Sequence, residues 1–556
     1  MTEEGTADES QGGNDLDRTA SFRRNSTQIP NANLKENGIS LDHDDQLRRG
    51  LKSRHLQFMA LGAAIGTGLF VGSGAILHMT GPAALWLGYI SMMAVVWIVM
   101  NVIGELATYL PLKGITLPYF AQRFVDPSLA FAAGWNYWYA YSVLVAAEAT
   151  AAAIVLDYWH TPVPAWVWIT IILSINLLIN IIAVGIFGEA EFWFASIKLI
   201  TILGLIIMGL AIMLGGAPTH ERLGFLYWQD PGAFKEYLVE GSTGKFLAYW
   251  KAFVLAGYSF ITSPELIGLA AGETVAPRRN LPKAVRRFSW RLTIFYGLSS
   301  LVVGTIVPSN DGRLLSPESN ANASPWVIAL QRAEIGGMNH VINAAILTSA
   351  WSAGNAFLYS GSRVLYSMAI NGQAPAVLGR TTGKGVPWVA VLATWAFGCL
   401  AYLNVSEGGA TVFLWFNSLS TISGYVAWIV VLVTYLRFRA ALSYRGLLDT
   451  LPFRTPLQPY ASWVVLAVVS LLTLTNGFQV FVAGHWDYKT FLASYITIPA
   501  FLLLYLGHKW KSRTPWMKPV DEIDVVTGKK EMDELCADDV DPVAKNWAQR
   551  IWFWIA

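Results

Sequence analysis

The apolar residues of the chain are concentrated in twelve long stretches that are separated by polar connections. A helix needs about 17–25 apolar residues to cross the hydrocarbon core of a bilayer, and each stretch approaches or exceeds that length. The stretches cover approximately residues 56–77, 83–106, 128–157, 163–184, 191–214, 247–271, 290–308, 338–370, 386–404, 411–437, 460–481 and 490–507. The pattern predicts an all-α polytopic membrane protein with about twelve transmembrane helices.

Lysine and arginine are gathered in the connections that follow even-numbered stretches. Residues 276–291, after the sixth stretch, carry six Lys or Arg and no acidic residue, and residues 437–454 add four arginines after the tenth. Positively charged connections stay on the cytoplasmic side of a membrane. We therefore expect a multi-pass membrane protein with both termini in the cytoplasm, which agrees with an even number of spans.

Composition narrows the class of protein further. The chain is 54% hydrophobic and only 14% charged, whereas about a quarter of the residues of a soluble domain are charged. Most of the chain is therefore expected to lie in the lipid bilayer, and no basic surface with interleaved aromatic residues points to nucleic acid. The eight histidines are scattered, and we find no nucleophile–base pair, no metal-ligand cluster and no phosphate-binding loop. We expect neither an enzyme nor a bound cofactor or metal.

The domain boundaries follow from the same pattern. Residues 1–50 and 512–556 are polar and mixed in charge, and they are expected to form solvated cytosolic tails. Residues 51–511 are expected to form the transmembrane domain.

Two of the apolar stretches carry residues that interrupt helices. The first contains the sequence LGAAIGTGLFVGSG (residues 61–74), with five glycines, and the sixth contains GYSFITSPELIG (residues 257–268), in which Pro264 removes a backbone donor. Unwound helices at membrane depth are tolerated where they line a cavity. Their exposed N–H groups suit a carboxylate and their exposed carbonyl groups suit an ammonium group, and an amino acid carries both. An offset of five spans between the breaks predicts a five-plus-five inverted repeat with discontinuous helices 1 and 6, plus two further helices.

Four ionisable residues are expected inside the bilayer, where charge is costly and therefore indicates a functional site. They are Glu148 in the third span, Lys198 in the fifth, and Lys251 and Glu265 in the sixth. Alternatives remain for three of them: Glu148 is also compatible with a structural, internally hydrogen-bonded carboxyl, and the two lysines with side chains that extend to the lipid headgroups.

Several motifs together resemble the fungal amino acid permeases of the amino acid–polyamine–organocation superfamily. They include RHLQFMALGAAIGTGLFVGSG, WNYWYAYSVLVAAE, GEAEFWFASIKLI, GLAAGETVAPRRNLPKA and SAWSAGNAFLYSGSRVLYSMA. The resemblance covers approximately residues 50–515. It implies proton-coupled import of amino acids by alternating access, with protons and an L-amino acid as partners.

The resemblance also implies roles for individual residues. The substrate carboxylate is expected at the backbone of the first break, at Ile65, Gly66, Thr67 and Gly68. The substrate amino group is expected at the second break, which comprises Ser259, Phe260, Ile261, Thr262 and Ser263. Glu148, Glu265 and Lys198 are expected to couple protons to transport, because in proton-coupled relatives a lysine of the fifth span stands where sodium-coupled ones bind an ion.

One departure from the family pattern bears on the substrate. The family's Phe-x-Gly-x-Glu at the sixth span reads Ile261-Thr262-Ser263-Pro264-Glu265 here, which resembles the dicarboxylic permeases. We therefore expect acidic substrates, glutamate or aspartate, with the anionic side chain met by Lys251 or by the group Ser349, Ser352 and Asn355. The alternatives are a neutral, proline or broad-range amino acid permease, and a sensor with the permease fold. The family also implies ubiquitin ligases as partners of the tails, with Lys35 and Lys52 as candidate acceptors.

Overall fold

A computed structural model of the chain describes most of the predicted membrane domain. The described residues are 66–111, 117–159, 162–182, 184–261, 263–270, 276–314, 324–383, 385–536 and 546–547. Within these ranges the chain is helical and contains no strand. The all-α prediction is therefore confirmed.

The membrane-spanning elements follow the predicted apolar stretches closely. They are η3 (Gly68–Gly72), α2 (Ser73–Thr80), α3 (Pro82–Tyr109), α5 (Pro127–Asp157), α6 (Ala165–Ile182), α7 (Val184–Met213), α8 (Gly241–Ala256), η5 (Gly257–Ser259), α9 (Ser263–Ala270), η7 (Thr293–Leu298), α11 (Ser299–Ile306), α13 (Met338–Ile370), α14 (Trp388–Gly398), η10 (Cys399–Leu403), α15 (Asn404–Glu407), α16 (Gly409–Tyr444), α17 (Tyr460–Leu474), α18 (Tyr488–Tyr495) and α19 (Thr497–Ser512). The basic connection before η7 forms the helix α10 (Pro277–Leu292). Shorter elements in the connections are α4 (Leu117–Phe124), η4 (Trp228–Gly232), α12 (Pro325–Arg332), η9 (Ala376–Gly379), η11 (Leu448–Thr450), η12 (Phe478–Phe481) and α20 (Lys529–Leu535).

Among the described residues, seven helical segments are long and apolar enough to cross a membrane, and the pair α18 and α19, bent by 43°, makes an eighth. The other four predicted spans are present as short or interrupted helices. They are η3 with α2, α8 with η5 and α9, η7 with α11, and α17. Every predicted stretch is thus occupied by helix, although length and composition alone identify only seven or eight spans.

Local sequence explains where two of the long helices begin. Pro82 and Pro127 occupy the first turns of α3 and α5, where a missing N–H group costs no hydrogen bond. Asp126 caps α5 through its carboxylate, which accepts hydrogen bonds from the N–H groups of Ser128 and Leu129. Capping fixes the start of the helix that carries Glu148.

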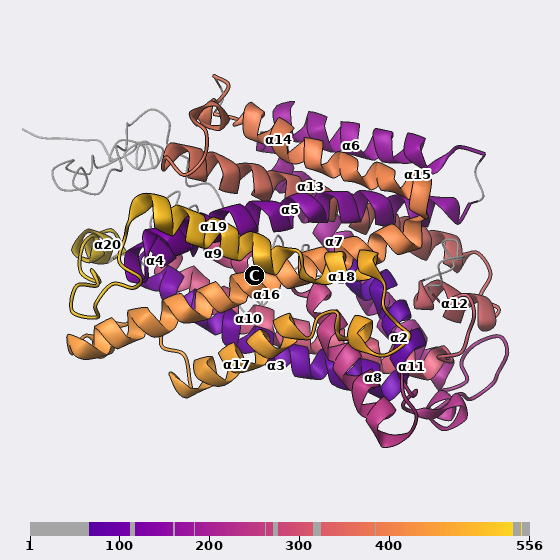
Figure 1. Cartoon of the computed structure of the whole chain (residues 1–556). Helices are drawn as coiled ribbons and strands as arrows, with labels where there is room; N and C mark the ends of the chain where they lie inside the picture. Colours follow the sequence, from indigo (N-terminus) through magenta and orange to yellow (C-terminus); the bar gives the residue numbers. More distant parts are fainter. Residues whose placement is uncertain are drawn as a thin grey trace, which may run out of the picture. The chain divides into compact units, whose positions relative to one another are not determined.

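The spans pack as two groups of helices. In the first group α3 packs against α2, α8, α9, α10 and α11, and in the second α5, α6, α13 and α14 pack against one another. Figure 1 shows α5, α6, α13 and α14 running side by side. The helices α7 and α16 contact both groups, since α7 packs on α11 and α13 and α16 packs on α3 and α5. We call these the α3 group and the α5 group.

The C-terminal tail differs from the expected solvated segment. Residues 514–536 lie against the ends of the spans, and Ile523 and Val525 are fully buried. The sequence pattern did not reveal this packing because the segment is mostly polar.

Candidate functional site

The two interrupted spans meet at Gly68. A Cβ atom at this position would lie 2.6 Å from Ser259 Oγ and 3.0 Å from Ser259 Cα, closer than real Cβ atoms approach other atoms. Tyr89 of α3 secures the contact, since its hydroxyl donates to the carbonyl of Gly68 (3.3 Å) and pairs with Ser259 Oγ (3.1 Å). Glycine is required at position 68 because the backbones of η3 and η5 approach so closely.

The sixth span is interrupted as predicted. The helix α8 ends at Ala256, a short 3-10 turn follows at η5, and α9 begins only at Ser263. Thr262 lies outside the described residues, as does Ile65 at the first break. The first break is therefore described on one side only, from Gly66 onward.

The helix α16 packs directly on the interrupted part of span six. Tyr425 donates a hydrogen bond to the carbonyl of Val254 (2.8 Å), and its hydroxyl would lie 2.1 Å from a Cβ at position 257. Ile261 lies against Gly424 of α16, where an added Cβ atom would be 2.5 Å from the Ile261 side chain. The small residues Gly257 and Gly424 thus let α16 approach the break closely. Tyr425 of α16 then supplies a donor for a carbonyl near the end of α8.

Phe260 is fully buried and packs against other aromatic side chains. Its ring contacts those of Tyr89 and Tyr296, with centroids 6.1 and 4.4 Å away. Tyr296 also donates to the carbonyl of Ser259 (3.1 Å). This aromatic cluster holds the η5 turn against α3 and η7.

Glu148 of α5 faces the first break. Thr67 Oγ1 donates to Glu148 Oε1 at 2.9 Å, whereas Glu148 Oε2 is buried and has no hydrogen-bond partner among the described atoms. Only 4% of the residue is exposed. A buried carboxylate oxygen without a donor is costly, so this position suits a proton or a bound group.

Lys198 lies between two carboxylates. The side chain is 1% exposed and interacts electrostatically with Glu191, on its own helix α7, and with Glu148 of α5. Ser352 of α13 donates to both oxygens of Glu191, at 3.1 and 3.0 Å. We call Glu148, Lys198 and Glu191 the charge triad.

Glu191 is the member of the charge triad that was not predicted from the sequence. It precedes Lys198 by seven residues, which is about two helical turns, so both side chains lie on one face of α7. A buried lysine needs a nearby anion. This spacing is the signal in the sequence that pairs Glu191 with Lys198.

The remaining predicted residues lie in separate environments. Lys251 is buried and hydrogen-bonded to Gln479 of η12, which also accepts from Tyr237 at 3.1 Å. Asn355 accepts a hydrogen bond from Asn180 of α6 at 2.7 Å. Ser349 and Ser263 are buried, on α13 and at the start of α9.

Glu265 follows the second break as predicted. The carboxyl group is buried and lies near the indole of Trp428 and the phenol groups of Tyr137 and Tyr141. Neither oxygen accepts a hydrogen bond of normal geometry within the described part of the chain. Glu265 is therefore a second buried carboxyl that can hold a proton.

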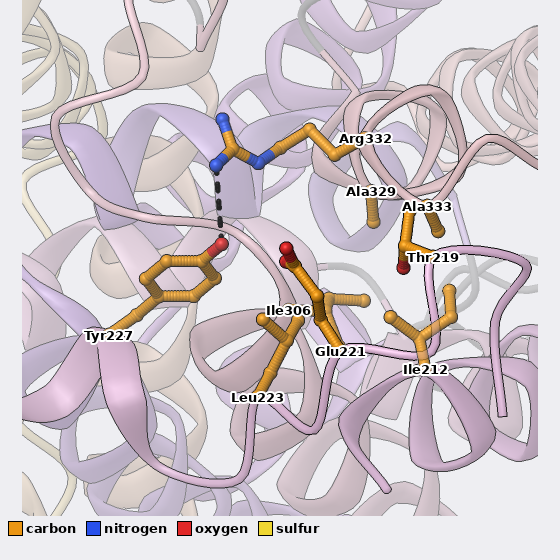
Figure 2. Close-up of a pocket in the computed structure, with 9 residues that line it drawn as sticks. All are labelled: Ile212, Thr219, Glu221, Leu223, Tyr227, Ile306, Ala329, Arg332 and Ala333. Carbon is orange, nitrogen blue, oxygen red and sulfur yellow. Dashed lines mark hydrogen bonds between the residues drawn. The ribbon is translucent and has the colours of Figure 1, made fainter. Parts of the chain in front are cut away.

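A small pocket lies away from both breaks. It has a volume of about 130 Å³, and Figure 2 shows Arg332 and Glu221 at its polar side, with Arg332 donating to the hydroxyl of Tyr227 (3.2 Å). None of the predicted site residues lines it. In the described ranges no group of three or more His, Cys, Asp or Glu side chains could hold a metal ion.

Comparisons with known proteins show what the chain is similar to. Residues 55–518 match the family model described as "Amino acid permease". A proline-specific permease of Emericella nidulans is 54% identical over 512 residues, covering 91% of this chain and 93% of that protein. A dicarboxylic amino acid permease of Saccharomyces cerevisiae is 39% identical over 500 residues, covering 88% of this chain and 82% of that protein.

A solved structure shows the same fold at low sequence identity. A manganese transporter of Eremococcus coleocola matches with a TM-score of 0.53 and 14% identity, covering 85% of this chain and 99% of that one. At this identity the likeness concerns the fold alone.

Proposed function

The chain belongs to the amino acid permease family, and on that basis we propose that it imports proline together with protons. The observation that carries the choice of substrate is the 54% identity with a proline-specific permease, against 39% with a dicarboxylic one. The expectation of acidic substrates is replaced by the alternative of a proline permease.

The charges near the breaks support this choice. A second carboxylate on the substrate would need a cation or a group of hydrogen-bond donors. The cation expected for that purpose, Lys251, is hydrogen-bonded to Gln479, and Ser352 donates to Glu191. Glu148 and Glu265 add negative charge to the region instead, so a zwitterion without a charged side chain is the better fit.

The charge triad supports proton coupling. With both carboxylates ionised and Lys198 protonated, the triad carries a net charge of −1 in a buried place, and one bound proton neutralises it. Thr67 belongs to the first break and also donates to Glu148, so substrate and proton meet at neighbouring atoms. Binding of one can therefore change the free energy of binding of the other.

The membrane potential favours the import of one proton with each proline. Proline is a neutral zwitterion, so one accompanying proton moves one net positive charge into the cell. The membrane potential then contributes about 2.3 kcal/mol per 100 mV. We propose that the protein lies in the plasma membrane with both termini in the cytoplasm, and that the α3 group and the α5 group rock about the site.

Uptake of radiolabelled proline at pH 5 and pH 7, in fungal cells that lack their own permeases, tests this function. We expect faster uptake at pH 5, abolished by a protonophore and by excess unlabelled proline. Glutamate, aspartate, leucine and lysine should not compete. Competition by glutamate would restore the acidic substrate, and equal competition by leucine and lysine would indicate a broad range.

A further inference from the structure

The segment that follows α19 returns to the spans and packs on them. Figure 1 shows the yellow C-terminal segment turning back toward α4. Ile523 and Val525 are fully buried, and Met532 and Cys536 of the same segment are nearly so. We call residues 514–536 the strap.

One side of the strap is anchored to the end of the α5 group. The N–H of Lys518 donates to the carbonyl of Val125 (3.2 Å), and its ammonium group donates to the carbonyl of Gln122 (2.9 Å). Arg123 of α4 donates to the carbonyl groups of Asp524 (2.8 Å) and Thr527 (2.6 Å) and pairs with the Asp524 carboxylate (3.2 Å). The helix α4 itself packs on α5.

The other side is anchored to the α3 group. Tyr109, the last residue of α3, donates to the carbonyl of Val525 at 2.7 Å. Arg278, in the first turn of α10, forms an ion pair with Asp533 at 2.5 Å. The α10 helix packs on α3, so both contacts hold the same group.

The end of α16 completes the attachment. Arg445 donates to the carbonyl groups of Asp521 (2.8 Å) and Ile523 (2.9 Å), and Arg437 donates to that of Lys518. The strap thus runs across a basic surface made by three different parts of the membrane domain. Most of these hydrogen bonds have backbone carbonyl groups as acceptors, so the pattern of side chains in the sequence did not predict them.

The two strap carboxylates that pair with Arg123 and Arg278 keep their charge at neutral pH. Burial raises the pKa of the Asp524 carboxyl, but hydrogen bonds from the Thr527 backbone and the charge of Arg123 outweigh it and lower that pKa below its usual value. For Asp533, burial is outweighed by Lys529 and Arg278, and the pKa is again lowered. A carboxylate with a lowered pKa loses its pairing energy only as the pH falls through that lowered value, well below the cytosolic range.

We propose that the strap is a latch that holds the α3 group and the α5 group together at this end of the molecule. The inference rests on the proposed alternating access, in which the two groups must separate at one end to release substrate. The strap spans both groups, so that separation requires the bonds of Arg123 or those of Tyr109 and Arg278 to break. The docked strap slows opening, and its release speeds transport.

The native cysteines supply a direct probe of docking. The chain contains two, and in a Cys399→Ser background Cys536 of the strap is the one remaining thiol. Membranes carrying this protein are treated with a membrane-impermeant maleimide from the side of the strap, with and without proline. We expect slow labelling in the parent protein and about fivefold faster labelling in the double variant Asp524→Asn with Asp533→Asn, since partly exposed ion pairs contribute up to about 1 kcal/mol each.

The rate of proline uptake shows whether the docked strap restrains transport or is only bound to the spans. The double variant should import proline at least twofold faster per molecule at the cell surface. Arg278→Gln, which breaks the Asp533 pair from the other side, should act in the same direction. Asp521→Asn is the matched control, because it removes the same charge from an exposed side chain of the strap, and it should leave both rates unchanged.

Two results would overturn the latch. Faster labelling without faster uptake would show a docked segment that does not restrain transport. Unchanged labelling in the double variant would show that these ion pairs do not hold the strap. The labelling comparison without proline needs no transported substrate, so its result stays separate from any failure of the proline assignment.

Discussion

Two buried carboxylates, one in the α3 group and one in the α5 group, have opposite surroundings. Glu105 of α3 is fully buried, and its oxygens accept from Arg439 (3.2 Å) and from the N–H (2.8 Å) and hydroxyl (2.7 Å) of Thr455. Glu148 of α5 is almost as buried, yet one of its oxygens accepts only from Thr67 and the other from no described atom. The satisfied carboxylate ties α3 to α16 and to the segment before α17, whereas the incompletely satisfied one faces a helix break.

The comparison teaches how to separate structural from functional charge. Burial alone does not distinguish the two residues. The count of hydrogen-bond donors does, because Glu105 has three and Glu148 has one, so only Glu148 keeps a buried oxygen without a described donor. Lys198 reinforces the distinction, since it interacts with both Glu148 and Glu191, so neither carboxylate has the lysine to itself.

The largest expected effect comes from Glu105→Ala. The substitution leaves the partly buried Arg439 and the buried Thr455 without this acceptor, and the free energy of unfolding should fall by about 3–5 kcal/mol. Thermal unfolding of the purified protein in detergent measures this loss. The double variant Glu105→Leu with Arg439→Leu should recover most of it; a destabilisation equal to that of the single variant would contradict the ion-pair account.

A smaller effect is expected from Gly68→Ala. The added methyl group meets Ser259, and overpacking of this kind costs about 1–3 kcal/mol. Gly68 belongs to the first break and Ser259 to the second, so the added methyl group disturbs both. We therefore expect the KM for proline to rise about tenfold with little change in the amount of protein. Gly72→Ala is the control, since its nearest neighbour would lie 3.8 Å away, and an equal rise in both variants would remove the breaks from the site.

The smallest effect is expected from Ser352→Ala. The variant loses a hydroxyl that is shared between both oxygens of Glu191, and a typical hydrogen bond contributes about 0.5–1.5 kcal/mol. The carboxylate then holds a proton more readily, so the pH at which uptake is half-maximal should rise. Thr348→Ala, one turn earlier on α13, should leave the pH profile of uptake unchanged. An equal shift of the half-maximal pH in this control would show that the effect does not come from the Ser352–Glu191 hydrogen bond.

Sequence reasoning reached the fold and part of the site. The apolar stretches marked all twelve helical regions, and Pro264 marked the interruption of span six, because length and backbone chemistry are visible in local sequence. Glu148 and Lys198 stood out as charges in apolar surroundings. Tyr89, which links Gly68 to Ser259, looked like any aromatic residue of a span.

The remainder depended on contacts between distant segments. Glu105 lies near the end of its span, where a carboxylate is unremarkable, and its partners lie 334 and 350 residues away. The anchors of the strap are mostly carbonyl groups, which every residue carries. Side-chain patterns cannot reveal such contacts.

The most direct test of the account separates proton coupling from substrate binding. Purified Glu148→Gln protein in proteoliposomes is assayed for proline counterflow, which needs no proton gradient, and for proline accumulation driven by an acidic exterior. We predict that counterflow is retained, that accumulation falls at least tenfold, and that thermal stability stays close to that of the parent. Accumulation at the parental level, or a loss of stability as large as that of Glu105→Ala, would contradict the assignment of Glu148 as a coupling carboxylate.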